Sequence, residues 1–383
     1  MIDTIVLTLE PDLFAITDHD KFDPSTKGLF EAPYYRLGRR ANFACFQNPS
    51  KEELKKGIYK PRLTVTKRMG ENGFIVTLKI EFSIPKLLFG NNFDEAEEGD
   101  FGEVVNILQK RLQEMGVLVF KNVLENTPVS AVHYSKNITL TDYSTPYAVL
   151  KELSKINLNQ KLDLNQTDFR NEGHSLKFRA NSFEIALYDK LKDLKKAKTS
   201  EKRAIERDNA LQLSLFDDLK PKKPFEVLRM EVRLNNRAKI KQVFKTLNIP
   251  YEITFSSVFK KDISQKTLLL YLDEIKNAYS LLAYKPKTMK DFIIDFRMLN
   301  PKVKIRKMLQ VLGLKMACND MGIREFRKST ESYGDYSWYR LKRDFTAYKY
   351  SENPLSVIKP IEKALFEFTP LRLVDFEEKK QTT

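Results

Sequence analysis

The sequence predicts an α+β fold, in which an antiparallel sheet is followed by a helical C-terminal region. Apolar and polar residues alternate strictly from Phe74 to Phe82 and from Leu228 to Leu234, within the predicted strand Phe225–Leu234, the pattern of strands with two different faces. From Gln265 to Tyr350 the apolar spacing is helical instead. Helices separate the predicted strands without a strand–helix–strand rhythm, which favours an α+β sheet domain.

Further strands and helices follow from the same spacing. Alternation predicts a strand through Ile5, Leu7 and Leu9, another at Val129–Ile138, and a hairpin over Leu176–Tyr188 that turns near residues 180–182. Helical spacing predicts helices at Phe101–Met115 and, rich in lysine, at Tyr188–Arg207. In the strand that ends at Leu234, we expect the apolar residues to face inward and the charged ones outward. The apolar residues are Leu228, Met230, Val232 and Leu234, and the charged ones are Arg229, Glu231 and Arg233.

These elements divide the chain into three parts. We expect a sheet domain over residues 1–262, with a charged insertion at about 195–224. A helical, basic domain follows at 263–350. Residues 351–383 are expected to form a C-terminal extension that is partly flexible.

The net charge is +15 over 383 residues, which favours a polyanionic partner such as nucleic acid, although a basic enzyme of another kind would show the same excess. The two cysteines form no CxxC pair, which excludes a zinc finger and fits a reducing cytoplasm. No apolar run approaches the roughly 18–20 residues of a membrane span, so we expect no membrane partner. With only three histidines, any metal site must rely on carboxylates.

Tyr188 lies at the junction between a predicted strand and a basic helix, with Lys190 two residues later. A tyrosine can attack a phosphodiester, and a neighbouring lysine or a divalent cation can stabilise the charge that develops. A half-buried strand tyrosine with no chemical role is the alternative.

Glu231 stands between Arg229 and Arg233 on the polar face of the last predicted strand. The carboxylate could hold Mg²⁺ or Mn²⁺ while the arginines reach DNA phosphates. The alternative is a ladder of ion pairs across strands.

His133, Ser135 and Asn137 share one face of another predicted strand. This geometry suits a metal-binding strand, with His133 as a ligand and Asn137 near DNA, and it also suits a solvated polar face.

Basic and aromatic residues alternate near the end of the helical region. Arg340, Lys342 and Arg343 lie among Tyr336, Trp338 and Tyr339. Such a segment can contact phosphates and stack on bases, so these three cations are candidate DNA-binding residues. An amphipathic helix with a solvated basic face remains open.

The segment QLSLF (212–216) resembles the short peptide by which bacterial polymerases and repair proteins bind the sliding clamp. Leu215 and Phe216 would fill an apolar pocket, and Gln212, followed by Leu213, would bind at its rim. The alternative is the end of an amphipathic helix that covers the core.

Five segments in order resemble the phage and plasmid replication proteins related to the filamentous-phage replication initiator, and the similarity runs from residue 1 to about 350. The segments are MIDTIVLTL (1–9), SIPKLLFGNN (83–92), VSAVHYSKN (129–137), IALYDKLKDL (185–194) and LRMEVRL (228–234). The resemblance implies a sheet core like that of the histidine-hydrophobic-histidine nickases. It also implies a metal-dependent, nicking-closing DNA endonuclease that starts rolling-circle replication.

On this resemblance, Tyr188 is the nucleophile, and Lys190 and Glu231 match the family's lysine and glutamate. The implied products are a 5′-phosphotyrosine link and a free 3′ hydroxyl, with Mg²⁺ or Mn²⁺ as cofactor. The implied partners are single-stranded or hairpin origin DNA and the replication machinery in the cytoplasm of a bacterial host. Only His133 of the histidine pair is present, because Ser135 stands at the second position. A DNA-binding protein that kept the fold and lost the chemistry is therefore the alternative.

Overall fold

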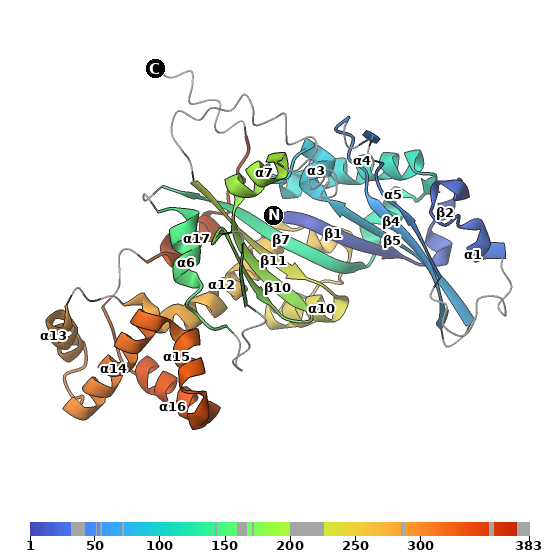
Figure 1. Cartoon of the computed structure of the whole chain (residues 1–383). Coiled ribbons are helices and arrows are strands. Elements are labelled where there is room, and N and C mark those ends of the chain that lie inside the picture. The colour runs from blue at the N-terminus through green and yellow to red at the C-terminus, as the bar shows by residue number, and fades with distance from the viewer. Residues whose placement is uncertain are drawn as a thin grey trace, which may run out of the picture.

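The computed structural model of the chain describes residues 1–31, 43–50, 52–53, 56–70, 73–141, 144–158, 167–170, 172–199, 226–284, 286, 288–351 and 356–373. Within these residues it contains a nine-stranded sheet of order β3-β4-β5-β1-β7-β11-β10-β9-β8, together with a helical C-terminal region (Figure 1). The strands of this sheet are β1 (Ile2–Leu9), β3 (Phe43–Gln47), β4 (Arg62–Gly70), β5 (Gly73–Ser83), β7 (Val129–Leu140), β8 (Thr167–Arg170), β9 (Ser175–Arg179), β10 (Phe183–Asp189) and β11 (Glu226–Leu234). A separate two-stranded ladder joins β2 (Ala15–Ile16) to β6 (Val117–Leu118).

Helices lie between the strands and dominate the chain after β11. Those before β11 are α1 (Lys27–Glu31), α3 (Ile84–Phe89), α4 (Phe101–Glu114), α5 (Lys121–Asn126), α6 (Pro146–Leu153) and α7 (Lys190–Thr199). Those after it are α10 (Arg237–Thr246), α11 (Phe255–Val258), α12 (Lys261–Ala283), α13 (Met289–Leu299), α14 (Ile305–Met321), α15 (Ile323–Ser329), α16 (Gly334–Thr346) and α17 (Ile358–Glu367). No helix among the described residues combines the length and the apolar character that a membrane crossing requires.

The predicted α+β class is confirmed, because every described strand pair in the large sheet is antiparallel. The alternating segments form β5, β7 and β11, and the predicted hairpin forms β9 and β10. The helix predicted from Phe101 is α4. The lysine-rich helix is described only as α7, and residues 200–225, which hold most of the predicted insertion and all of the QLSLF segment, lie outside the described residues.

Three segments that are far apart in the sequence meet at the centre of the sheet. The N-terminal strand β1 lies between β5 and β7 and is antiparallel to both. β11 pairs with β7 on one side and with β10 on the other. This order brings the predicted site strands β7, β10 and β11 side by side and adds β1 to them.

One face of this central region is an apolar layer covered by helices. Val132, Tyr134, Met230 and Val232 are all fully buried. Helices α10 and α12 pack against β7 and β11, and the Tyr134 hydroxyl donates a hydrogen bond to the Val258 carbonyl of α11 at 3.4 Å. The periodicity of the strands therefore places the core as predicted.

The opposite face is also covered, and this corrects one prediction. Arg229 and Glu231 do lie on the face opposite the apolar residues, but they are only 2% and 1% exposed rather than directed outward. The reason is the chain that follows α3, because Asn92 in this segment accepts a hydrogen bond from Arg229 through its backbone carbonyl at 2.6 Å. Strand periodicity reports which face a residue is on, but it does not report what covers that face.

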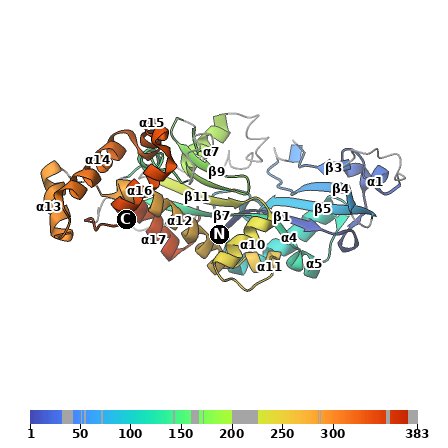
Figure 2. The same cartoon turned by 90° about the horizontal axis from the view of Figure 1, so that it is seen from below.

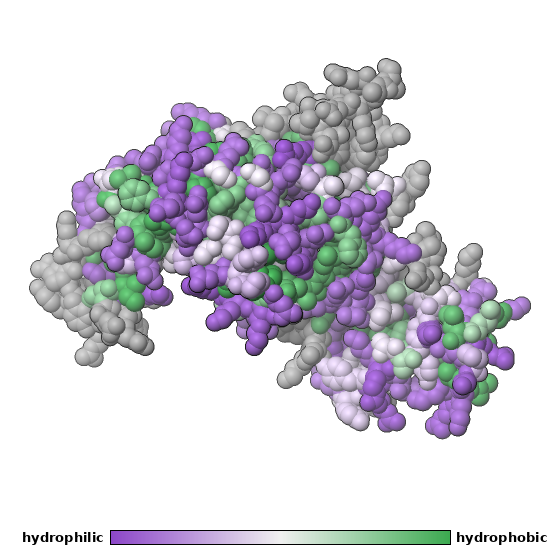
Figure 3. Space-filling view, turned by 180° about the vertical axis from the view of Figure 1, so that it is seen from behind, coloured by the Kyte–Doolittle hydropathy of each residue, from purple (hydrophilic) through white to green (hydrophobic). Residues whose placement is uncertain are grey.

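The C-terminal helices share a continuous core with the sheet. Residues such as Val232 in β11, Leu272 in α12 and Phe345 in α16 belong to one buried cluster. α12 begins beside the predicted boundary at residue 262, and α17, within the predicted extension, packs against β7 and α12. Helices α13–α16 gather at one end of the molecule, away from β3 and β4 (Figures 1 and 2). Seen from behind, the surface is mainly hydrophilic with hydrophobic patches between the charged side chains (Figure 3).

Candidate functional site

The candidate site lies on the polar face of the central strands. Because side chains directly opposite each other on paired strands share a face, the register decides which polar residues meet. The facing pairs are Tyr188 with Arg229, Arg229 with Asn137, Glu231 with Ser135, and Arg233 with His133. The residues that the sequence singled out in three separate segments are therefore neighbours in space.

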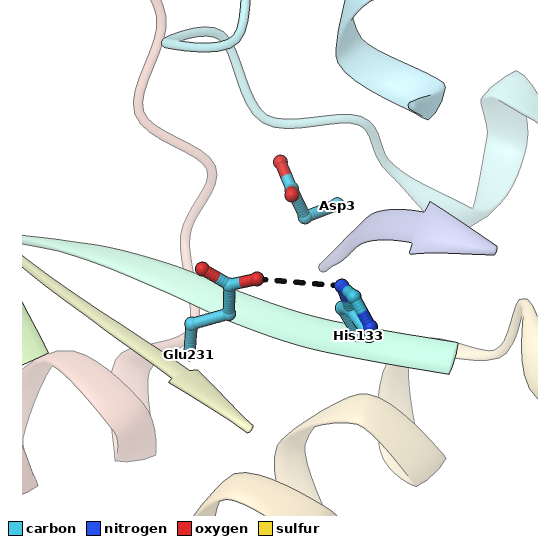
Figure 4. A group of neighbouring side chains, drawn as sticks. All are labelled: Asp3, His133 and Glu231. Carbon is cyan, nitrogen blue, oxygen red and sulfur yellow. Dashed lines mark ion pairs between the residues drawn. The ribbon is translucent and has the colours of Figure 1, made fainter. Parts of the chain in front are cut away.

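A possible cation site lies in this group. One potential ligand atom from each of Asp3, His133 and Glu231 lies within 4.8 Å of the other two, and His133 Nδ1 is 3.5 Å from Glu231 Oε1. Figure 4 shows Glu231 and His133 joined by their ion pair, with Asp3 beside them; the three residues come from β11, β7 and β1. The pairing of β1 with β7 is irregular between Ile2 and Thr4, at Asp3. The structure thus brings together His133 and Glu231, both predicted ligands, and adds Asp3.

The charges in this cluster suit a cation. Burial raises the pKa of Asp3, but the positive charges of Arg229 and Lys190 lower it by more, so the net shift of this pKa is downward. For Glu231, burial raises the pKa and Arg233 lowers it more, again with a net downward shift. Burial lowers the pKa of His133. At neutral pH the cluster therefore holds two carboxylates and a neutral imidazole, which are the protonation states that bind metal ions.

Tyr188 is connected directly to this cluster. Its hydroxyl donates to Glu231 Oε2 over 3.3 Å, and its side chain is only partly buried. Burial raises the pKa of the Tyr188 phenol well above 10; Arg229 opposes this shift and Glu231 adds to it. The phenol is therefore protonated at neutral pH, and its use as a nucleophile requires added positive charge nearby.

Lys190 begins helix α7 and is completely buried. Its ammonium donates to Asn92 Oδ1 over 2.9 Å and lies 5.8 Å from the centre of the Tyr188 ring. Burial, followed by repulsion from Arg229, lowers the pKa of Lys190 to about 7. The bend from β10 into α7 thus keeps the lysine ammonium beside the tyrosine ring.

Arg229 has an internal role that the sequence did not suggest. Its guanidinium donates to Asp3 Oδ1 at 2.7 Å and to Ser135 Oγ at 2.8 Å, besides the Asn92 carbonyl. Its side chain is only 2% exposed and is engaged by these three partners; contact with DNA phosphates stays a prediction. Its geometry is that of a positioning residue, because it holds Asp3 against the cluster.

Asn137 and Arg233, the other predicted DNA-binding residues of the sheet, differ in exposure. Asn137 is 2% exposed, and its amide donates to the Phe93 carbonyl at 2.7 Å. The Arg233 side chain is 29% exposed. It holds Glu231 through Nε at 2.9 Å and contacts Glu184 through Nη1 at 3.0 Å.

A pocket of about 400 Å³ opens beside the cluster. Its lining includes all three cluster residues and three basic side chains, Arg62, Lys86 and Arg233. A phosphate group could enter between the basic side chains and the cluster, where charge-assisted hydrogen bonds favour an anion. Sequence reasoning missed Asp3, Arg62 and Lys86; an acid within the apolar segment MIDTIVLTL was the one visible signal for Asp3.

The remaining predicted residues lie elsewhere. Arg340, Lys342 and Arg343 are on α16, at the helical end of the molecule and away from the cluster. The clamp-binding residues Gln212, Leu213, Leu215 and Phe216 lie outside the described residues.

Comparison with known proteins gave no relative: no family model, no curated protein and no solved structure matches this chain. The geometry of the site is therefore the basis for any functional assignment.

Proposed function

We propose that the chain is a replication initiator that nicks one strand of origin DNA, stays attached to the 5′ phosphate through Tyr188, and later rejoins the strand. The observation that carries the proposal is the contact between the Tyr188 hydroxyl and Glu231. Glu231 also belongs to the cluster with Asp3 and His133. A nucleophile and a set of cation ligands therefore share one side chain.

The reaction would proceed by direct displacement at phosphorus. The Tyr188 oxygen forms a bond to the phosphorus of a backbone phosphate, and the bond from that phosphorus to the 3′ oxygen breaks. The tyrosine loses its proton and the departing 3′ oxygen gains one, so the products are a 5′-phosphotyrosine link and a free 3′ hydroxyl. The same steps in reverse rejoin the strand.

The electrostatics of the site support this chemistry. Two carboxylates and an imidazole suit Mg²⁺ or Mn²⁺, and such an ion would supply the positive charge that a phenol with a raised pKa needs. Arg233 orients Glu231, and Arg229 orients Asp3. Lys190 adds a cation beside the tyrosine ring when it is protonated. A single histidine would be enough in this cluster, because Asp3 would supply a third ligand.

The proposal is tested by covalent capture. Purified protein with Mn²⁺ is mixed with a 3′-labelled pool of random single-stranded DNA, and the products are separated under denaturing conditions. The wild type should retain label, and Tyr188→Phe should lose the adduct while it still binds DNA. Tyr147→Phe, at a tyrosine that is 41% exposed on α6, is the matched control and should behave as the wild type. An undiminished adduct in Tyr188→Phe would move the nucleophile elsewhere, and DNA binding with no adduct in any protein would favour the catalytically inactive alternative.

A further inference from the structure

Helices α15 and α16 form a compact pair at the helical end of the molecule. The connection is residues 330–333, and α16 starts at Gly334, whose φ of 77° is the left-handed conformation that glycine adopts readily. Two short helices joined by a turn of about four residues with a glycine have the layout of a helix–turn–helix. α14 packs against both helices, as the first helix of such a unit does.

Specific contacts fix α16 against α15. Arg327 of α15 donates to Asp335 at 3.0 Å and lies 5.4 Å from the centre of the Trp338 ring. The Phe326 and Trp338 rings are 6.1 Å apart. Trp338 and Phe345 face the core, with exposed fractions of 8% and 1%. One face of α16 therefore packs against the interior of the unit.

The opposite face of α16 is open to solvent. Tyr336 is 78% exposed and Tyr339 is 41% exposed, and Arg340 and Arg343 are also exposed. The spacing of these four residues (336, 339, 340 and 343) places them on one stripe of a helix. Lys342, by contrast, is half-buried and lies off this stripe.

The charge around this stripe is positive. The segment 302–346 holds eleven lysines and arginines against five aspartates and glutamates. Both acids of α16 form ion pairs within the unit, Asp335 with Arg327 and Asp344 with Lys307 at 2.8 Å. The exposed stripe thus presents two arginines and two tyrosines, while the two acids of α16 pair with cations of α15 and α14.

We propose that α14, α15 and α16 form a helix–turn–helix unit that binds duplex DNA, with the exposed stripe of α16 lying in the major groove. The major groove accepts one α-helix, and arginine reads guanine there through two hydrogen bonds. Tyr336 and Tyr339 lie in the first half of the helix, the part that contacts base edges in such units. This inference deepens the proposed function and rests on it for the identity of the duplex as an origin. Binding to duplex next to the site of nicking is a different role from holding the strand at Tyr188.

The experiment selects duplex binders with the full-length chain. The Tyr188→Phe protein is used, because it cannot trap DNA covalently, and the probe is a pool of 40-base-pair duplexes with a randomised centre. The protein should enrich a sequence motif. The Arg340→Ala/Arg343→Ala double variant should lose at least about tenfold in affinity for the enriched duplex. Tyr336→Ala, at a still more exposed position, should alter the preferred bases.

The matched control is Lys266→Ala/Lys363→Ala. It removes the same two charges from exposed positions on α12 and α17, and it should keep the motif and most of the affinity. Equal losses of affinity in the two double variants would mean that only the net charge of the protein matters, and would overturn the inference. So would tighter binding to one strand of the enriched sequence than to the duplex itself, since the tyrosines would then serve base stacking. The adduct assay described under the proposed function does not depend on α16. A negative result for duplex binding would therefore not contradict the proposal that Tyr188 nicks DNA.

Discussion

The buried Arg229 gives the sharpest test of how the site is assembled. In Arg229→Met, a side chain of similar length removes the guanidinium that contacts Asp3, Ser135 and the Asn92 carbonyl. Because the Asp3 carboxylate then loses its partner in a site where it is only 18% exposed, the change resembles breaking a buried ion pair. Such changes cost about 3–5 kcal/mol of unfolding free energy.

The assay is equilibrium denaturation in urea, with Arg111→Ala as the control. Arg111 pairs with Glu114 on the surface of α4, where such a pair is worth below about 1 kcal/mol. Adding Asp3→Asn to Arg229→Met should recover part of the loss, since the uncompensated charge is gone. A loss in Arg229→Met no larger than in Arg111→Ala would refute the view that Arg229 holds Asp3 in place.

The same pair predicts a pH dependence. Arg229 holds the pKa of Asp3 below its ordinary value, so the stability from this pair is present above the unfolded pKa of about 4. It is lost as the pH falls through the lower, folded pKa. The difference in stability between wild type and Arg229→Met should therefore be full at neutral pH and shrink in acid. A difference that stays constant down to acid unfolding would contradict this assignment.

Three further predictions concern the chemistry and the partners. In Glu231→Gln and His133→Ala, the Mn²⁺ concentration needed for half-maximal adduct formation should rise by at least about tenfold in a metal titration. An unchanged Mn²⁺ requirement would show that these residues are not metal ligands. The rate of adduct formation at low DNA concentration should fall as the pH rises through about 7, because Lys190 loses its proton there. Lys190→Arg should abolish that fall. A rate that rises with pH instead would make Lys190 a base. A peptide spanning 212–216 should bind a bacterial sliding clamp in a fluorescence-anisotropy titration, and the same peptide with Leu215→Ala and Phe216→Ala should not. Equal binding by both peptides would show that these two side chains do not anchor the peptide.

Sequence periodicity was sufficient for β1, β5, β7, β9, β10 and β11 and for the partition of residues between their faces, but it gave no prediction for β3, β4 or β8. The alternation in β7 separates Tyr134 from His133, and that in β11 separates Met230 from Glu231, as the structure shows. This partition follows from the two-residue repeat of a strand, which is a local property. The resemblance to replication initiators pointed to the same strands.

The rest of the site depends on contacts that no local pattern encodes. The placement of β1 between β5 and β7 brings Asp3 to the cluster across more than 100 residues of sequence. Burial of Arg229 depends on Asn92, which lies 137 residues away in the chain. The alternation correctly gave the face of Arg229, but long-range packing decided that this face is buried. The hydrogen bond from Arg229 to Asp3 therefore gives it a positioning role that the alternation alone did not indicate.

The most direct test of the central claim is to locate the covalent bond. Wild-type protein is incubated with Mn²⁺ and the single-stranded DNA pool, digested with nuclease and trypsin, and analysed by mass spectrometry. The tryptic peptide from Ala180 to Lys190 contains a single tyrosine, Tyr188. We predict that this peptide carries the mass of a nucleotide phosphate on that tyrosine, and only when the metal is present. A nucleotide on any other residue, or none on a protein that binds the DNA, would contradict the account.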